Sequence, residues 1–276
     1  MTVKIVTDST ADIPEGICHE LGITVVPLSV HFGKMVYENG VDITNEDFYQ
    51  KLQESDVFPT TSTKSPGYFT SVYQKLAGEG DPVISIHVSE NFSATIESAR
   101  LGRQNSGIPV EIVDSESASM GLGLLTIMAA RAAADGATVE DIKSLLSEAI
   151  PNTLVLGLFE TIAYLQKGGR IGKARAFIGS LLKIKPIIAI QHGAIVPIQR
   201  ARSKSRGIDL LCNLVNEFGV PRELATMYTN IPSDADELMK QLKGNYPEQV
   251  IYSASIGPVI GSHVGPGSVG VSVVRL

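Results

Sequence analysis

The sequence predicts an α/β protein in two domains: a parallel-sheet α/β domain over residues 1–152 and an α+β domain over residues 153–276. In the first half, short β-branched runs alternate with helical patterns, which is typical of a parallel sheet with helices on both faces. Around Ile150-Pro151-Asn152 this alternation ends, and a hairpin signal follows further along the chain. Two domains that meet at a cleft are the simplest interpretation of this change.

The expected elements of the first domain follow from these runs. Strands are predicted at residues 3–7, 24–30, 83–88 and 110–113, and helices at residues 45–54, 66–77, 92–103 and 121–134. Thr44 with Asp47 resembles a capping box, and Ser65-Pro66 supplies an N-cap followed by proline at the first helical position.

The second domain is expected to mix helices with antiparallel strands. Strands are predicted at residues 154–159, 185–191, 195–200, 224–228 and 249–253, and helices at residues 175–182, 203–218 and 234–242. Gln191-His192-Gly193-Ala194 has the pattern of a hairpin turn between two of these strands, which indicates antiparallel pairing.

Composition indicates an ordinary globular protein. Hydrophobic residues make up 43% of the chain and charged residues 19%, which argues against disorder and leaves room for an apolar cavity. Cys18 and Cys212 are too far apart in sequence to suggest a metal cluster or a disulfide framework. The N-terminus has no export-signal pattern, and the weakly polar stretch at residues 117–130 is about half the length a bilayer requires. A soluble, cytoplasmic protein is therefore expected.

A basic segment stands out in a chain whose formal net charge is -6. Between Thr161 and Ile208 the sequence contains ten Lys and Arg residues and no Asp or Glu. Such a segment creates a positive field that attracts a carboxylate, a phosphate or an acidic partner. It begins with a glycine turn, residues 167–173, in which backbone amides and Arg170 can approach one anion closely. The alternative is a tight turn followed by a solvated basic face.

Two hydroxyl-rich segments are candidates for anion contact. Residues 60–65 place five hydroxyls, including those of Thr61 and Ser62, just before a predicted helix whose free N–H groups favour an anion. Ser93 follows the strand at residues 83–88 and is expected to face the same crevice, because ligands gather at the carboxyl ends of parallel strands. For residues 60–65, the alternative is that the hydroxyls satisfy the local backbone.

Two further strand ends carry the same pattern, Asp8-Ser9 and Asp114-Ser115. We interpret both as helix caps and turn formers in preference to ligand contacts.

Near the C-terminus, residues 256–268 are dense in glycine and proline and surround His263. This composition predicts a stiff irregular loop that holds backbone amides and one imidazole in a fixed place. A structural histidine and a ligand contact both remain open at this position.

Several motifs are absent from the sequence. The turn at residues 167–173 lacks the Walker A spacing, no GxGxxG follows the first strand, and Ser93 lies in no GxSxG elbow. HExxH and CxxC are missing too. We therefore assign no catalytic residue, no metal ligand and no cofactor.

One set of segments, taken in order, resembles the DegV family, whose members resemble the fatty-acid-binding subunit of bacterial fatty acid kinase. These segments are Thr7-Asp8-Ser9-Thr10, residues 60–66, Ser93, Asp114-Ser115, residues 167–172, Lys185-Pro186 and residues 261–267 with His263. The resemblance implies a two-domain α/β protein that holds one long-chain fatty acid in a tunnel between its domains. It implies carboxylate contacts at Thr61 and Ser93, with Arg170 and His263 close by, and we add the neighbouring Ser62.

The resemblance also implies a role without turnover, in which the protein presents the acyl carboxylate to a separate kinase and receives the acyl phosphate. The later charges of the basic segment, Arg200, Arg202, Lys204 and Arg206, then become the candidate surface for docking the kinase catalytic subunit. Transient contact with a membrane fits the same role.

Two other functions compete with this interpretation. A stand-alone enzyme for a small phosphorylated or acidic substrate would use Arg170 and His263 in a short, polar pocket. A nucleic-acid binder would use the basic segment, but the overall acidity and the lack of aromatic residues among those charges count against it.

This chain departs from the family at one position. Relatives commonly have Ser-Gly-Thr where this sequence has Ser93-Ala94-Thr95. A positive φ at Ala94 would be strained, so the carboxylate pocket is expected to differ locally.

Overall fold

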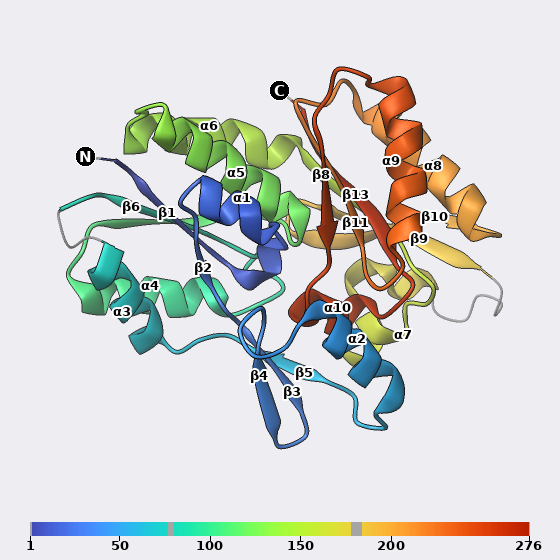
Figure 1. Ribbon diagram of the computed structural model, residues 1–276, viewed down its shortest axis with the longest axis horizontal. Helices are drawn as coiled ribbons and strands as arrows, with labels where there is room; N and C mark the ends of the chain where they lie inside the picture. The colour runs from blue at the N-terminus through green and yellow to red at the C-terminus, as the bar shows by residue number, and fades with distance from the viewer. Residues whose placement is uncertain (1, 77–79, 178–183, 276) are drawn as a thin grey trace.

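The computed structural model describes residues 2–76, 80–177 and 184–275. Figure 1 shows two main sheets side by side, with helix α5 (Met120–Ala134) lying between them and a small third sheet below. The α/β fold class expected from the sequence is confirmed, with a parallel sheet in the first half and a largely antiparallel sheet in the second.

The first sheet has four parallel strands in the order β2-β1-β6-β7. In that order they are Thr24–Val26, Lys4–Asp8, Val83–His87 and Val110–Asp114. Both faces are buried, because alternate side chains of β1 enter different clusters: Ile5 packs with α5, and Val6 packs with Phe69 and Tyr73. Besides a helix described with the third sheet below, the described helices of this half are α1 (Glu15–Glu20), α3 (Pro66–Leu76), α4 (Thr95–Ser106), α5 and α6 (Val139–Ala149).

The second sheet has six strands in the order β10-β9-β8-β13-β11-β12. In that order they are Ala194–Ala201, Lys185–Gln191, Thr153–Leu158, Val269–Val274, Glu223–Tyr228 and Ile251–Ser255. Every neighbouring pair is antiparallel except β11 and β12. The predicted turn at residues 191–194 joins β9 to β10, with His192 and Gly193 both at positive φ. Helices α8 (Lys204–Phe218) and α9 (Pro232–Asn245) cover the outer face.

A third sheet of three short strands was not expected. It pairs β4 (Met35–Glu38), β3 (Ser29–Phe32) and β5 (Thr60–Ser62), and α2 (Asn45–Glu54) packs on it. The single strand predicted at residues 24–30 is wrong, because β2 ends before Pro27, which has no N–H to donate, and β3 joins the small sheet. The expected loop at residues 60–65 begins as strand β5.

Other boundaries also differ from expectation. The irregular loop predicted at residues 256–268 contains helix α10 (Pro258–Val264), and α7 (Ala163–Lys167) precedes the glycine turn. Three short 3-10 helices, η1 (Ser9–Ala11), η2 (Ile150–Asn152) and η3 (Gly172–Phe177), complete the elements of the described residues. The helix predicted at residues 175–182 lies largely outside the described residues.

Helix α5 is buried between the two main sheets. Its side chains share one apolar cluster with Ile5 and Ile84 of the first sheet and with Val155 and Met227 of the second. Two glycines allow this close packing: a Cβ at Gly121 would lie 2.4 Å from Val155, and a Cβ at Gly123 would lie 2.7 Å from a backbone oxygen of η1. In the described part of the chain, no helix combines the length and the apolar character needed to cross a membrane.

Candidate functional site

A cavity of about 390 Å³ lies between the two main sheets. Its walls come from the loops after β1 and β6, the start of α5, strands β8, β9 and β13, strand β5, and helices α7 and α10. The first of these walls is the carboxyl end of a parallel sheet, where open α/β sheets place their ligands. Most lining side chains are apolar, among them Phe92, Phe159, Leu165, Ile188 and Met227.

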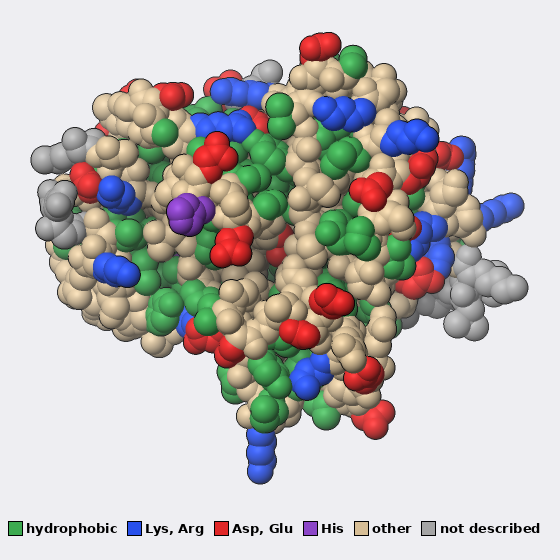
Figure 2. Space-filling view, in the orientation of Figure 1, with side chains coloured by type: hydrophobic (Ala, Val, Ile, Leu, Met, Phe, Trp, Pro, Cys, Tyr) green, Lys and Arg blue, Asp and Glu red, His purple; other side chains and the backbone are tan. Residues whose placement is uncertain are grey.

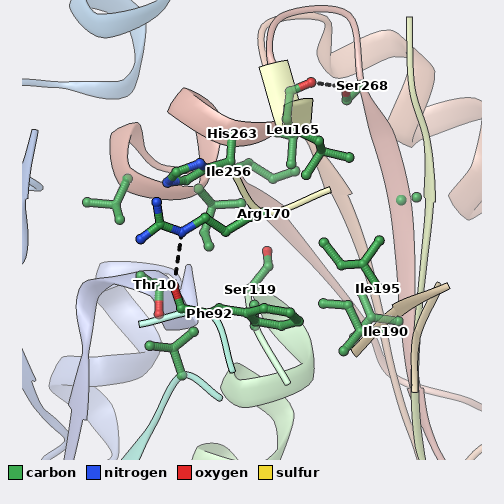
Figure 3. Close-up of a pocket in the computed structure, with 18 of the residues that line it drawn as sticks. Thr10, Phe92, Ser119, Leu165, Arg170, Ile190, Ile195, Ile256, His263 and Ser268 are labelled. Atoms are coloured by element: carbon green, nitrogen blue, oxygen red, sulfur yellow. Dashed lines mark hydrogen bonds between the residues drawn. The ribbon is translucent and has the colours of Figure 1, made fainter. Parts of the chain in front are cut away.

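The structure brings all five sequence-predicted contact residues to this cavity: Thr61, Ser62, Ser93, Arg170 and His263. Figure 3 shows Arg170 and His263 next to each other on one side of it, while Ile190 and Ile195 lie on the opposite side. The cavity therefore has a polar end and an apolar body. We call the polar end, with Thr61, Thr63, Ser93, Arg170 and His263, the mouth.

Neighbouring hydroxyls of strand β5 form hydrogen bonds with different partners, because side chains alternate along a strand. Thr61 Oγ1 hydrogen-bonds to His263 Nε2 at 3.2 Å, whereas the Ser62 hydroxyl bonds to His31 Nε2 at 2.8 Å. Successive side chains of a strand point to opposite sides, so Thr63, next after the strand, is expected on the side of Thr61. Thr63 Oγ1 is buried, lines the cavity and has no hydrogen-bond partner in the structure. A ligand oxygen would satisfy this hydroxyl.

His263 is held in the neutral form. Burial, together with the nearby charge of Arg170, lowers the pKa of His263 from 6.5 to about 4. Its Nδ1 is buried without a hydrogen-bond partner. Gly168 passes directly beside it, since a Cβ on Gly168 would lie 2.3 Å from Nδ1. At neutral pH the imidazole therefore brings hydrogen-bonding capacity to the mouth without charge.

Arg170 brings the positive charge. Its Nε donates to the Phe92 carbonyl at 3.1 Å, and its Nη1 donates to the Gly168 carbonyl at 2.8 Å. The side chain is exposed, and a guanidinium has five N–H donors, so donors remain for an anion. The bond to Phe92 links the glycine turn to the loop after β6 across the mouth.

Ser93 serves both the mouth and its own helix. Its Oγ lies 2.8 Å from Thr95 Oγ1 and accepts from Thr95 N at 3.3 Å, which satisfies a free N–H at the start of α4. Ala94 has a φ of -77°, so the strained positive φ considered for this position does not arise. The Ser93 hydroxyl thus satisfies the local backbone, and the residue also lines the cavity.

Four further polar residues of the cavity wall were not predicted as contacts from the sequence: Thr10, Thr63, Ser119 and Ser268. Thr10 belongs to the motif at the end of the first strand, and Thr63 to the hydroxyl segment, but nothing in either pattern distinguishes them as contacts. Ser119 donates to Asp12 Oδ2 at 2.6 Å and gave no signal in sequence.

The cap interpretation of the two strand-end aspartates is correct, since Asp8 accepts from Thr10 N and Asp114 accepts from Glu116 N.

The match to a protein family decides the identity of the chain. A family model described as uncharacterised protein, DegV family, matches residues 2–276. The chain belongs to the DegV family. Protein DegV of Bacillus subtilis (strain 168) is 33% identical over 276 residues, which cover 98% of this chain and 98% of that protein.

Solved DegV structures share the whole fold. A DegV family protein from Thermus thermophilus, described by its fatty acid binding, has a TM-score of 0.94 and 31% identity, with 100% of both chains covered. DegV from Bacillus subtilis, described as a fatty acid binding protein, has a TM-score of 0.90 and 32% identity, again with 100% of both chains covered. A stearic acid-binding protein from Eubacterium ventriosum has a TM-score of 0.89 and 26% identity, covering 99% of this chain and 98% of that chain.

The basic residues suggested for docking lie apart from the cavity of this DegV chain. Lys204 forms an ion pair with Asp234 at 2.7 Å, and Arg206 lies 3.7 Å from Asp209. Arg200 stacks over the Phe177 ring, 4.6 Å from its centroid, and Arg202 is exposed. None of the four lines the cavity. Of these four residues, Lys204 and Arg206 lie near carboxylates, whereas Arg200 and Arg202 have no ion pair with a carboxylate among the described residues.

Proposed function

We propose that this protein binds one long-chain fatty acid in the cavity and presents its carboxylate to a separate fatty acid kinase subunit. The observation that carries the proposal is the cavity of about 390 Å³, apolar along its body and hydrogen-bonding at its mouth. Relatives with 31% and 32% identity over the whole chain, described by fatty acid binding, support the choice of ligand. The role in acyl-phosphate formation extends this binding function.

The apolar body supplies affinity for the acyl chain. Burial of a methylene group gains about 0.8 kcal/mol, so a chain of roughly sixteen carbons offers a gross gain above about 10 kcal/mol before its ordering cost. A small phosphorylated or acidic substrate would leave most of these apolar walls in contact with water. The stand-alone enzyme is therefore the less favoured function.

The mouth suits a carboxylate because its hydrogen-bonding groups are neutral except for one exposed cation. Thr61, Thr63 and Ser93 offer hydroxyls, the neutral His263 offers an imidazole, and Arg170 balances the charge. An ionised head group without these partners would be too costly to bury. Since Arg170 is exposed, a kinase can reach the head group there while the acyl chain stays covered.

We assign the chain no turnover of its own and place the exchange with the kinase in the cytoplasm. Its docking surface is proposed to centre on Arg200 and Arg202, with Lys204 and Arg206 beside them. Replacing both Arg200 and Arg202 with serine is expected to leave fatty acid binding unchanged and to slow acyl-phosphate formation by the kinase. Equal rates for this variant and the original chain would exclude the surface.

The ligand itself is tested first. Organic extracts of the purified protein, examined by mass spectrometry, are expected to contain long-chain fatty acids. Addition of palmitic acid to delipidated protein is expected to raise its melting temperature. The proposal is wrong if the extract contains no lipid and palmitic acid leaves the melting temperature unchanged.

The position of the head group is tested on β5. Thr61→Val removes one hydroxyl from the mouth and is expected to weaken palmitic acid binding by about tenfold or more, the effect of a lost hydrogen bond to a charged group. Thr60→Val is the matched control, because Thr60 is exposed and does not line the cavity. Equal losses in the two variants would place the head group elsewhere.

A further inference from the structure

Asp8 is a buried carboxylate at the end of β1 that gathers four hydrogen bonds. Oδ1 accepts from the backbone N of Thr10 at 3.0 Å and from the Thr10 hydroxyl. Oδ2 accepts from Val88 N at 3.1 Å and from His87 Nδ1 at 2.9 Å. The side chains of Asp8 and His87 are both completely buried, so water does not replace any of these bonds.

The network continues away from the cavity. His87 Nε2 lies 2.7 Å from Ser85 Oγ, which also accepts from the Tyr73 hydroxyl at 3.0 Å. Asp8, His87 and Ser85 have the composition of a hydrolytic triad, but all three are fully buried and none lines the cavity. A substrate therefore has no access to Ser85, and hydrolysis there is excluded.

The partners of Asp8 lie in the cavity wall even though Asp8 does not. Thr10 and Val88 both line the cavity, and they come from two different segments, η1 and the end of β6. Beyond Val88 the chain turns at Ser89, whose carbonyl accepts from Phe92 N at 2.9 Å and from Ser93 N at 3.2 Å. The position of Val88 thus influences where the Phe92 ring and the Ser93 hydroxyl lie.

The same turn connects to the charged side of the mouth. The Phe92 carbonyl accepts from Arg170 Nε, as the dashed line in Figure 3 shows, and Thr10 lies close to this pair in that view. Movement of the β6 end relative to η1 would therefore displace Ser93 and Arg170 relative to the rest of the mouth. Beyond the paired residues of β1 and β6, the last of which are Val6 and Ser85, the Asp8 carboxylate opposes that movement.

We propose that Asp8 is a positioning residue for ligand binding, which holds η1 and the end of β6 together so that the mouth keeps its shape. The inference rests on the proposed function, because it predicts an effect on fatty acid affinity. Asparagine cannot replace the carboxylate. Whichever way its amide is turned, the NH₂ group faces either the Thr10 donors or the Val88 and His87 donors, and one of the two wall segments is released.

The test compares affinity with stability. Dissociation constants for palmitic acid are measured on delipidated protein by displacement of cis-parinaric acid, and melting temperatures are measured without ligand. Asp8→Asn is expected to raise the dissociation constant by about tenfold or more, and to lower the melting temperature. Leu146→Ala is the matched control, because Leu146 is buried in α6 away from the cavity and its truncation destabilises the core alone. It is expected to lower the melting temperature and to change the dissociation constant by less than about twofold.

A second pair of variants keeps the inference testable if Asp8→Asn does not fold. His87→Asn retains an N–H donor for Asp8 and is expected to keep the affinity, whereas His87→Leu removes the donor and is expected to weaken binding. The inference is overturned if the folded Asp8→Asn variant, or otherwise His87→Leu, binds palmitic acid as tightly as the original chain. If the original chain itself binds no palmitic acid, the proposed function fails instead.

Discussion

Gly168 shows how a single missing side chain shapes the mouth. Its φ of -75° is accessible to any residue, so the backbone does not require glycine there. The space does require it, because a Cβ would lie 2.3 Å from His263 Nδ1. The next residue, Gly169, has the opposite character: its φ is +72°, and a Cβ added there would meet no atom within 4 Å.

These two glycines give a matched pair of variants. Gly168→Ala is expected to displace the His263 ring, to break its bond with Thr61 and to weaken palmitic acid binding by about tenfold. Gly169→Ala is expected to cost about 1–2 kcal/mol of stability through its left-handed conformation and to leave the affinity unchanged. Fatty acid titration and urea unfolding of both variants check this. Unchanged affinity in Gly168→Ala would show that His263 does not act in binding.

Two half-buried titratable groups are expected to make stability depend on pH in opposite directions. Burial raises the pKa of Asp12 from 3.8 to about 7, although the Ser119 hydroxyl and the Gly257 N–H partly oppose the shift. Between these values the folded protein holds a proton that the unfolded chain releases, so this contribution to stability is lost as the pH rises. For His263, whose pKa falls from 6.5 to about 4, the unfolded chain holds the extra proton, and stability is gained as the pH rises.

Single variants should separate the two contributions. Asp12→Asn removes the contribution to stability that falls as the pH rises. The free energy of unfolding of this variant is therefore expected to rise more steeply with pH between about 4 and 6.5 than that of the original chain. His263→Gln removes the rising contribution and is expected to give a stability that falls with pH over the same range. Urea unfolding at a series of pH values measures both slopes. Parallel slopes in all three proteins would contradict the assignment.

At the scale of elements, glycines inside helices mark close contacts as well as flexibility. A Cβ on Gly121 of α5 would lie 2.0 Å from Ser117 Oγ and 2.4 Å from Val155. Gly121→Ala is therefore expected to destabilise the protein by about 1–3 kcal/mol despite alanine's better helix propensity. Gly16→Ala in α1 is the control, since a Cβ there would meet no atom within 4 Å, and is expected to stabilise by about 0.5–1 kcal/mol. Urea unfolding checks the difference in sign.

The same contacts explain which elements could be predicted from sequence. Strands β1, β6 and β7 were predicted close to their observed bounds because each is a short run rich in β-branched residues. Strand β13 was missed because Gly270 interrupts its pattern, although a Cβ there would lie 2.7 Å from the Leu156 carbonyl. Helix α10 was mistaken for a loop because glycine, proline and β-branched residues have low helix propensity, which close packing of Gly261 against Phe48 and Tyr49 overrides.

The site, like the fold, was predicted only in part from local sequence patterns. Residue types, together with the resemblance to the DegV family, singled out the five predicted contact residues that the structure brings to one cavity. Strand β5 was not predicted, so the alternation of side chains that distinguishes Thr63 from Ser62 was not used to assign the cavity contacts. The hydrogen bonds of Asp8 join the end of β1 to Val88, just after β6, and these two residues are 80 positions apart in sequence. A local sequence pattern does not reveal a contact over that separation.

The whole molecule is built around one shared helix. Figure 2 shows a continuous surface over both halves on the face in view, and beneath it the cluster around α5 contains side chains of both main sheets. Because neither sheet can lose α5 without exposing apolar surface, we expect a single cooperative unfolding transition in differential scanning calorimetry. Two separated transitions would show that the proposed domains, residues 1–152 and 153–276, are independently stable.

The place of β13 in the chain also bears on how the protein is made. This strand lies in the middle of the second sheet, between β8 and β11, yet it follows every other described element in sequence. During synthesis on the ribosome, β8 and β11 must wait for it, while the face of α5 that it covers stays exposed to chaperones. Val269 and Gly270 form part of the cavity wall. A ligand can therefore be enclosed only after these residues have left the ribosome, so loading follows the synthesis of β13.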